Sequence, residues 1–366
     1  MRTTTAALSR GLAGPFSVEP IQVADPVGDE VLVRVVAVGV CHTDLTGRLA
    51  SALGAPVLLG HEGAGVVEEV GPDVTGIRPG DHVVLSFRSC GRCGRCVAGR
   101  PAYCAEWQAL NAFGRRGDGS PMVCAGGRPV MAGFFGQSSF AGYALAHQDN
   151  VVVVDPGVDL AVAAPFGCGF QTGAGAVLNV LRPDESSTVV VYGTGSVGLA
   201  GLLAAHGSGA RTIAVNPSAP RRELALRLGA THALDPTGID VAAAIADLTG
   251  GGSTHALDTT GVPAVIASAV KALAPTGTAV VVGLGLAELT VDVLDLLYGG
   301  KTLRGCVEGD AVPQTFIPHL LDLYAAGRLP VDQLITTFPL AQINEAVAAQ
   351  QAGEVVKAVL MPEMPC

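Results

Sequence analysis

The sequence predicts an α/β protein with two domains, one rich in β-strands and one built on a doubly wound parallel sheet. Three observations support this fold class. The chain has 366 residues, which is longer than one ordinary domain. Residues 31–40 and the segments GAGVVEEVG and DHVVLSF have the apolar and alternating patterns of strands. From about residue 171, apolar strands alternate with helical segments, which is the order of parallel strands joined by helical crossovers.

The domain boundaries follow from where this alternation begins and ends. The β-α pattern lapses near residue 304, and the remaining chain supplies helices and one last strand, which we expect to return to the first domain. Residues 105–139 have little periodicity and are predicted to form a long surface loop. The apolar stretch 280–298 is predicted to form strands, either at a subunit interface or at the end of the sheet. We therefore predict a β-rich domain of residues 1–170 and 305–366, and a parallel-sheet domain of residues 171–304.

The composition argues against several functions. Hydrophobic residues make up 49% of the chain and charged residues 15%, which is typical of a compact globular protein. A net charge of −10 disfavours a nucleic-acid partner, because such proteins gather lysine and arginine on one face. The N-terminus lacks the sustained apolar run of a signal peptide, and glycines interrupt the longest apolar runs. We expect a soluble, cytoplasmic protein without a membrane partner.

Four of the nine cysteines are close together in CGRCGRCVAGRPAYC. Their spacing, C-x2-C-x2-C-x7-C, lets tight turns aim four sulfur atoms at one point, as in a structural zinc site. Four thiolates around Zn²⁺ carry a net charge of −2, which backbone N–H groups and Arg92, Arg95 and Arg100 would offset. An iron–sulfur cluster is the competing metal, and disulfides or free thiols are the alternatives without metal. The predicted ligands are Cys90, Cys93, Cys96 and Cys104.

A second metal site is suggested by Cys41 in GVCHTD, His61 in GHEG and Cys168 in GCGFQTG. Catalytic zinc keeps three protein ligands and one open position, and two cysteines with one histidine form a known ligand set. Two thiolates and a neutral imidazole leave such a site without net charge. By composition alone each residue is more simply explained as a buried side chain, since no spacing connects the three.

A dinucleotide site is predicted by VVVYGTGSVG, which contains Gly193, Gly195 and Gly198 between an apolar strand and a helical pattern. The first two glycines permit a tight turn and close approach to a pyrophosphate, and the third allows close packing. Ser196 and Val197 would begin the helix whose N-terminus faces that pyrophosphate. The triplet alone is a weak signal in a chain with 49 glycines, but its strand-turn-helix setting strengthens it.

The choice between NAD and NADP depends on the end of the next strand. An acidic residue usually binds the ribose there, and this chain has Asn216 instead. The neutral amide does not repel a 2′-phosphate, and Ser218, Arg221 and Arg222 are candidates to bind it. Arginines at the start of a helix are also common on solvated surfaces, and Asn216 can still bind a ribose hydroxyl. The sequence therefore leans slightly toward NADP.

Several motifs occur together in one order: GVCHTD, GHEGAGVVEEVG, GDHVV, CGRCGRC and YGTGSVGLAG. In this the chain resembles the zinc-dependent medium-chain alcohol dehydrogenases, from about residue 15 to the C-terminus. The resemblance implies a GroES-like catalytic domain and a Rossmann dinucleotide-binding domain. It also implies that Cys41, His61 and Cys168 bind a catalytic zinc and that the four clustered cysteines bind a structural zinc.

The same resemblance implies roles for the neighbouring residues. Glu62 matches a carboxylate that lies behind the catalytic zinc, and Asp44 matches an acceptor for the ligand imidazole. Thr43 matches a hydroxyl that bonds the alcohol oxygen, and His42 matches a contact to the cofactor pyrophosphate. Many relatives end the proton relay in a histidine at the position of Thr46, so the proton exit differs here.

The segments FFGQSSFA, GCGFQTGAGAVLNVL and VEGDAVPQTFIPHLL resemble the aryl (benzyl) alcohol dehydrogenase branch. That branch implies benzylic, allylic or other bulky primary alcohols, and a homodimer or homotetramer. Phe87, Trp107 and Phe134 are candidate pocket walls, although each is equally explained as core. Two alternatives remain: a reductase of conjugated C=C or C=N bonds, and a nucleotide-binding scaffold without catalysis.

Overall fold

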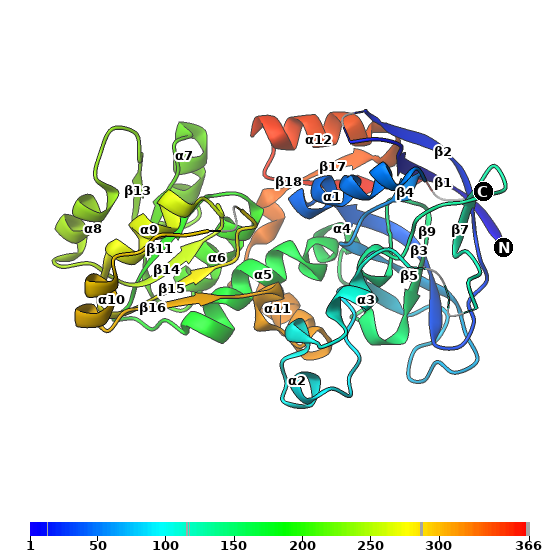
Figure 1. Cartoon of the computed structure of the whole chain (residues 1–366), viewed down its shortest axis with the longest axis horizontal. Helices are drawn as coiled ribbons and strands as arrows, with labels where there is room; N and C mark the ends of the chain where they lie inside the picture. The colour runs from blue at the N-terminus through cyan, green and yellow to red at the C-terminus, as the bar shows by residue number, and fades with distance from the viewer. Residues whose placement is uncertain (13, 115, 117, 286–287, 364–366) are drawn as a thin grey trace. The chain divides into compact units, whose positions relative to one another are not determined.

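The computed structural model divides into two compact units (Figure 1). It describes residues 1–12, 14–114, 116, 118–285 and 288–363. The first unit comprises Met1–Cys168, Val312–Asp322 and Asp332–Cys366, and the second comprises Gly169–Ala311 and Leu323–Val331. Compared with the predicted parallel-sheet domain of residues 171–304, the second unit extends a few residues past 304. It also includes a short segment of the C-terminal region.

The first unit is built on two β-sheets. One has the strand order β4-β1-β2-β7-β8, and the other has the order β10-β6-β5-β3-β18-β17 with β9 also paired to β3. The strands are β1 (Arg2–Ser9), β2 (Phe16–Val23), β3 (Glu30–Gly39), β4 (Val57–Leu58), β5 (Gly63–Val70), β6 (His82–Leu85), β7 (Val123–Ala125), β8 (Arg128–Pro129), β9 (Tyr143–His147), β10 (Val151–Val153), β17 (Ile335–Pro339) and β18 (Lys357–Met361).

Strand β3 is the centre of the second of these sheets. It pairs with β5, β9 and β18, and Val31, Leu32 and Val33 on it are fully buried. Such a run of branched apolar residues suits a strand covered on both faces. The antiparallel pairing of β18 with β3 brings the C-terminal strand next to the strand that leads to Cys41. The sequence analysis predicted one last strand in this region. The structure has two strands there, β17 and β18, which pair in parallel.

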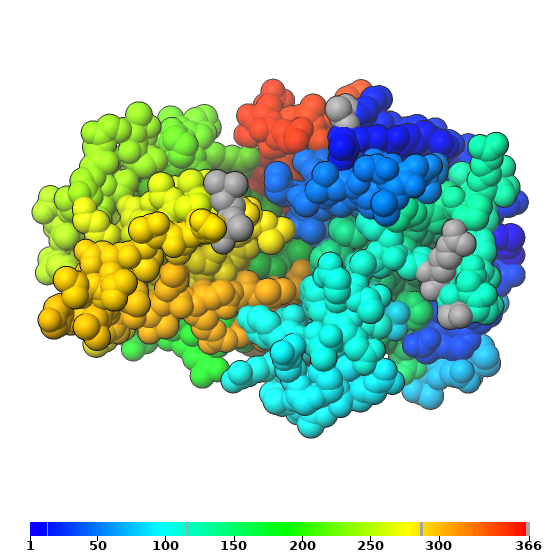
Figure 2. All heavy atoms as spheres, in the orientation of Figure 1, coloured from blue at the N-terminus to red at the C-terminus, as the bar shows by residue number. Residues whose placement is uncertain are grey.

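The helices of the first unit are short, and one segment stands apart from the sheets. They are α1 (His42–Gly47), α2 (Gly94–Val97), α3 (Trp107–Asn111), α4 (Leu160–Ala163), most of α11 (Pro313–Ala325) and α12 (Ile343–Ala352). The segment that carries α2 and α3 projects as a separate lobe, coloured cyan in Figures 1 and 2. This lobe contains the four clustered cysteines.

The prediction of a long surface loop over residues 105–139 is wrong. That segment contains α3, β7 and β8, and its last part is buried, including Phe134, Gln137 and Ser139. Local sequence did not reveal this because the order comes from packing against other strands. Ser139 N, for example, donates to Gly60 O at 2.7 Å.

The second unit confirms the predicted doubly wound parallel sheet. Its strand order is β13-β12-β11-β14-β15-β16, and every neighbouring pair is parallel. The order of the strands reverses at β11, which is the switch point where such sheets bind ligands. The strands are β11 (Thr188–Tyr192), β12 (Arg211–Val215), β13 (His232–Leu234), β14 (Ser253–Asp258), β15 (Leu273–Val281) and β16 (Thr302–Gly305).

Helices connect these strands, as the alternating pattern predicts. They are α6 (Ser196–Gly207), α7 (Ala219–Arg227), α8 (Val241–Thr249), α9 (Pro263–Lys271) and α10 (Val293–Gly299), and a further helix, α5 (Gly169–Gly175), precedes β11. The prediction of strands over 280–298 holds only at its start, because β15 ends at Val281 and residues 293–298 belong to the helix α10. Its start is fixed by Asp292, whose carboxylate accepts hydrogen bonds from Leu294 N and Asp295 N.

Within the described residues, no single helix combines the length and the apolar character needed to cross a membrane. The segments Leu160–Gly167 and Gly169–Leu181 meet that criterion only when they are counted together across a sharp bend.

Candidate functional site

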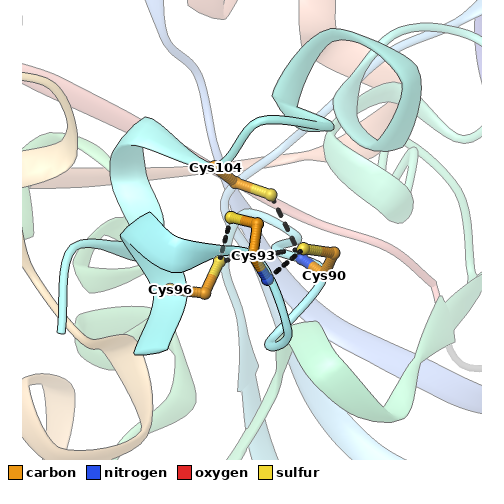
Figure 3. A group of neighbouring side chains, drawn as sticks. All are labelled: Cys90, Cys93, Cys96 and Cys104. Atoms are coloured by element: carbon orange, nitrogen blue, oxygen red, sulfur yellow. Dashed lines mark hydrogen bonds between the residues drawn. The ribbon is translucent and has the colours of Figure 1, made fainter. Parts of the chain in front are cut away.

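The four clustered cysteines point their sulfur atoms at one another (Figure 3). All four sulfurs lie within 4.8 Å of one another, and the Sγ atoms of Cys93 and Cys96 are 3.5 Å apart. Backbone N–H groups donate to the sulfurs, including Cys90 N to Cys104 Sγ at 3.3 Å and Cys93 N to Cys90 Sγ at 3.3 Å. Such N–H···S bonds are a common feature around the sulfurs of metal-binding cysteines.

Charge supports a cation in this group. Hydrogen bonds from the backbone, first from Ala105, lower the pKa of Cys93 to about 6. Burial and the neighbouring sulfurs raise the pKa of Cys96 to about 12, so without a cation one sulfur must keep its proton. A dication removes that need. Of the arginines interleaved with these cysteines, Arg92 pairs with Glu106 at 3.0 Å and also interacts electrostatically with Cys90 and Cys104, and Arg95 donates to Tyr103 O.

A second donor group brings together the cysteines and the histidine that spacing does not connect. The ligand atoms of Cys41, His61, Glu62 and Cys168 lie within 4.8 Å of one another. Cys41 follows β3 and begins α1, whereas His61 follows the left-handed Gly60 after β4. Cys168 follows the short 3-10 helix of residues 164–167.

The imidazole of His61 is oriented for a metal. Its Nδ1 lies 2.8 Å from Asp44 Oδ1, and Asp44 also accepts from Gly60 N and Cys41 N at 3.0 Å. Asp44 therefore fixes both the ring and the two chain segments beside it. The other ring nitrogen, Nε2, is buried and has no hydrogen-bond partner among the described residues. A buried ring nitrogen with a free lone pair is the usual feature of a metal-binding histidine.

The charges around Cys41 also favour metal binding. Hydrogen bonding with Cys168, together with the charges of His61 and Lys357, lowers the pKa of the Cys41 thiol well below its usual value, although burial opposes this shift. The donor group therefore offers one thiolate at Cys41, a second sulfur at Cys168 and the imidazole of His61. Zinc accepts this set and retains one open position.

A carboxylate and a lysine lie behind these ligands. Glu62 is fully buried and forms an ion pair of 2.5 Å with Lys357, which is itself 1% exposed. Burial favours the neutral amine, but the charges of Glu62 and Cys41 raise the pKa of Lys357 above its usual value. Burial also raises the pKa of the Glu62 carboxyl, to about 7, although the lysine opposes this shift. The sequence analysis missed Lys357. A single lysine within the apolar run VVKAVLM was the available signal.

Two aromatic rings hold the other side of the imidazole. Phe135 stacks on the His61 ring with centroids 4.5 Å apart, and Phe134 meets it edge-on at 5.4 Å. Phe135 has a left-handed φ of 53°, which is rare for a bulky residue, and Asn150 Nδ2 secures it by donating to Phe135 O at 3.1 Å. Sequence analysis missed the role of Phe135.

A cavity of about 330 Å³ opens beside these rings. Its walls are mostly aromatic and aliphatic and carry no charged side chain. They include Thr46, Leu49, Trp107, Phe113, Phe134 and Phe135. Of the predicted pocket walls, Trp107 and Phe134 line this cavity, whereas Phe87 is buried and packs against Trp107, with ring centroids 5.0 Å apart.

The remaining predicted residues of the first unit lie around helix α1. Thr43 Oγ1 is 3.6 Å from Cys41 Sγ, so its hydroxyl is beside the metal ligands. His42 and Thr46 are exposed, and Thr46 Oγ1 is 3.5 Å from His42 O. The structure thus places Thr43, but not Thr46, next to the donor group.

In the glycine turn of the second unit, each of the three positions is occupied by glycine for a different physical reason. Gly193 has φ of +88°, and a Cβ on Gly198 would lie 1.9 Å from Gly193 O, so these positions require glycine. A Cβ on Gly195 would meet nothing within 4 Å, so that glycine leaves open space at the start of α6. Ser196 and Val197 form the first turn of that helix. Open space before a helix N-terminus suits a phosphate group.

Some of the residues predicted to bind the cofactor's ribose already have partners within the protein. Asn216 Oδ1 accepts from Ser218 N at 2.8 Å, which shapes the turn after β12. Arg222 donates to Asn216 O and pairs with Asp235 at 3.0 Å, so its charge is already balanced. Arg221 is half-buried, and burial lowers its pKa. Ser218 is exposed.

Comparison with known proteins matches both halves of the chain. The alcohol dehydrogenase GroES-like domain family matches residues 28–156, and the zinc-binding dehydrogenase family matches residues 196–326. Geraniol dehydrogenase of Castellaniella defragrans is 49% identical over 361 residues, covering 97% of each chain. The crystal structure of benzyl alcohol dehydrogenase from Acinetobacter calcoaceticus is similar with a TM-score of 0.95 and 42% identity, covering 99% of this chain and 100% of that one. A zinc-binding dehydrogenase from Sinorhizobium meliloti 1021, solved with NADP, has a TM-score of 0.81 and 25% identity over 99% of this chain and 100% of that one.

The two donor groups predict two separable metal ions. The purified chain should contain two zinc ions, the Cys93→Ser variant one, and the Cys168→Ser variant one, because each substitution removes a thiolate from a different group. Elemental analysis of dialysed protein measures this. The Cys124→Ser variant is the matched control, since Cys124 is half-buried on β7 and belongs to neither group; it should keep both ions. Loss of both ions from Cys93→Ser protein that remains folded would contradict two independent sites.

Proposed function

The chain belongs to the zinc-dependent alcohol dehydrogenases, and we propose that it interconverts bulky allylic or benzylic primary alcohols and their aldehydes at the site described above. Its enzymatic class is that of a zinc- and NAD(P)-dependent oxidoreductase. This excludes the scaffold alternative as its main role. The observation that carries the proposal is the donor group of Cys41, His61 and Cys168, whose imidazole contacts Phe134 and Phe135, two rings that also line an aromatic cavity.

In this proposal, Cys41, His61 and Cys168 hold the catalytic zinc, and the four clustered cysteines hold a structural zinc. Bound zinc supplies a Lewis acid that lowers the pKa of the alcohol. Asp44 keeps Nδ1 of His61 protonated, so that Nε2 always presents its lone pair. Phe134 and Phe135 fix the plane of the same ring and keep water from it.

Proton transfer is assigned to Thr43. A hydroxyl both accepts and donates, so it takes the alcohol proton and releases its own toward solvent without carrying a charge. Thr46 occupies the position where many relatives have the relay histidine, and a threonine does not titrate near neutral pH. The exposed position of Thr46 supports direct release to water.

Hydride transfer requires a nicotinamide cofactor bound at the glycine turn. Gly193, Gly195 and Gly198 with Ser196 and Val197 are proposed to cradle its pyrophosphate, and His42 to contact it from the first unit. Asn216, Ser218 and Arg221 are proposed at the adenosine ribose. The neutral amide of Asn216 slightly favours NADP over NAD, because it does not repel the 2′-phosphate. Arg222 contributes less to this preference, since it is already paired with Asp235.

The substrate class follows from the walls of the cavity. A pocket of about 330 Å³ lined by aromatic rings and no charged side chain accepts a flat, unsaturated carbon skeleton better than a polar one. Geraniol is an allylic alcohol and benzyl alcohol is a benzylic one, and these are the substrates named in two of the similar proteins. The same cavity would also hold a conjugated aldehyde, so the position of reduction has to be measured.

The first prediction of this proposal concerns the reaction. With geraniol or benzyl alcohol the purified enzyme should reduce NAD(P), and with cinnamaldehyde it should give cinnamyl alcohol, identified by chromatography. The Cys41→Ser variant should lose about a thousandfold in kcat/KM, since the Lewis acid contributes several kcal/mol. Saturated aldehyde as the product would favour the C=C reductase instead. Initial rates with both cofactors decide the preference, and a strong NAD preference would remove the lean toward NADP.

The second prediction concerns Trp107, the only tryptophan in the chain. Because it lines the cavity, geraniol should change its fluorescence with saturation. The Trp107→Ala variant should raise KM for geraniol roughly fivefold, which corresponds to an aromatic contact of about 1 kcal/mol, and should leave KM for ethanol nearly unchanged. Trp107→Phe is the matched control and should keep most of the affinity. Equal losses for both alcohols would place Trp107 outside the pocket.

We further infer a homo-oligomer that uses the face of α10. This helix exposes Val293, Leu294, Leu297 and Tyr298, and Tyr298 is 84% exposed. Figure 2 shows the α10 region, in orange, at the surface of the second unit. Next to α10, β16 is the edge strand of the sheet, and an apolar face beside an open strand edge favours association with a second copy. A cytoplasmic location is also proposed, and cell fractionation tests it.

Light scattering after gel filtration checks the oligomer. The wild-type chain of 36.8 kDa should elute at a multiple of that mass, and Leu297→Glu should shift it toward one chain, because a buried carboxylate at the interface is unfavourable. The control is Leu226→Glu on α7, which is also exposed and should keep the assembled mass. A wild-type protein with the mass of one chain would rule out the proposed assembly.

A further inference from the structure

Lys357 is one of the most deeply buried side chains of the first unit. It begins β18, it is 1% exposed, and its Nζ contacts Glu62 Oε2 at 2.5 Å and donates to Val40 O at 3.0 Å. Burying an ammonium group is unfavourable unless it is paired and hydrogen-bonded. The fold satisfies both conditions for Lys357, so its place is specific.

The surrounding backbone leaves room for this pair. Gly39, which pairs with Val359 of β18, has no side chain, and a Cβ there would lie 1.9 Å from Glu62 Oε2 and 3.1 Å from Lys357 Cε. The absence of a side chain at Gly39 thus lets Glu62 turn toward the lysine. The alternative direction for the carboxylate is toward the metal ligands.

Glu62 is close enough to become a ligand itself. One of its oxygens belongs to the donor group whose atoms lie within 4.8 Å of one another, together with Cys41, His61 and Cys168. Four protein ligands complete a tetrahedral zinc site and close it, as in structural sites. A carboxylate added to two thiolates would also leave a dication with a net charge of −1, which disfavours binding of an anion. A catalytic site therefore needs something that keeps this carboxylate occupied.

We propose that Lys357 is a positioning residue that holds the Glu62 carboxylate away from the catalytic cation and so keeps one coordination position open for the alcohol. This inference rests on the proposed function. The ammonium neutralises the carboxylate and binds one of its oxygens, while Val40 O fixes the ammonium on the side of β3. Without the ammonium, the nearest positive charge to the buried carboxylate is the cation, and the carboxylate becomes its fourth ligand.

The test measures whether the site is open without relying on turnover. The full-length enzyme is loaded with Co²⁺ in place of zinc and titrated with imidazole, a small ligand for an open position. The four-cysteine site is saturated, so the visible difference spectrum comes from the other site alone. Wild type should show a saturable change. Lys357→Met should keep two metal ions per chain but bind imidazole at least tenfold more weakly.

The rescue separates positioning from a merely structural contribution. The double variant Lys357→Met with Glu62→Gln should recover imidazole binding to within a fewfold of wild type, because the neutral amide is a poor ligand; Glu62→Gln alone should behave like wild type. If Lys357→Met does not fold, Lys357→Gln keeps a donor for Val40 O and tests the same loss of charge. Wild-type imidazole binding in the single lysine variant, or no recovery in the double variant, would overturn the inference. No imidazole response in wild type would instead contradict the open site of the proposed function.

Discussion

The structure depends on one constraint: several charged groups converge in the fully buried space behind Cys41 and His61. The sulfurs of the half-buried Cys41 and the buried Cys168 lie beside the buried carboxyl groups of Asp44 and Glu62 and the buried ammonium of Lys357. Such a set is stable only when each charge has a partner. Asp44 has the imidazole and two backbone N–H groups, Glu62 has the lysine, and Cys41 has Cys168 and the positive charges of His61 and Lys357.

The backbone helps to hold these buried charged groups by passing very close to them at glycine positions. Gly39, Gly63 and Gly167 each place main chain where a side chain would collide with a buried group of the site or with neighbouring backbone. Gln137 ties the same region together, because it donates to His61 O at 2.9 Å and accepts from Gly63 N at 3.1 Å. The ligands are therefore held by a dense polar network, and their geometry is set before any metal or substrate arrives.

The lobe that holds the four clustered cysteines is connected to the substrate cavity by a short path. Trp107 N donates to Cys104 O at 3.1 Å, and the Trp107 ring meets Phe135 edge-on at 6.0 Å. Phe135 in turn stacks on His61. In the proposed function, a structural metal would take no part in chemistry but would help to order Trp107, which forms one wall of the cavity. The stability of the lobe and the shape of the cavity are thus linked through α3.

The sequence by itself determined the fold class, the four-cysteine group, the glycine turn and, through family resemblance, the likeness of Cys41, His61 and Cys168 to a zinc site. These signals are local: fixed spacing of thiols, three glycines after a strand, and alternation of strand and helix. It failed over residues 105–139 and 280–298, where tertiary packing overrode weak local patterns. Only the tertiary structure paired Lys357 with Glu62, placed Phe135 on His61 and brought Phe87 against Trp107. Each of these contacts joins residues from separate strands or loops, and the partner of a buried charge or ring depends on which segments the sheet brings together, a property that no single segment of sequence contains.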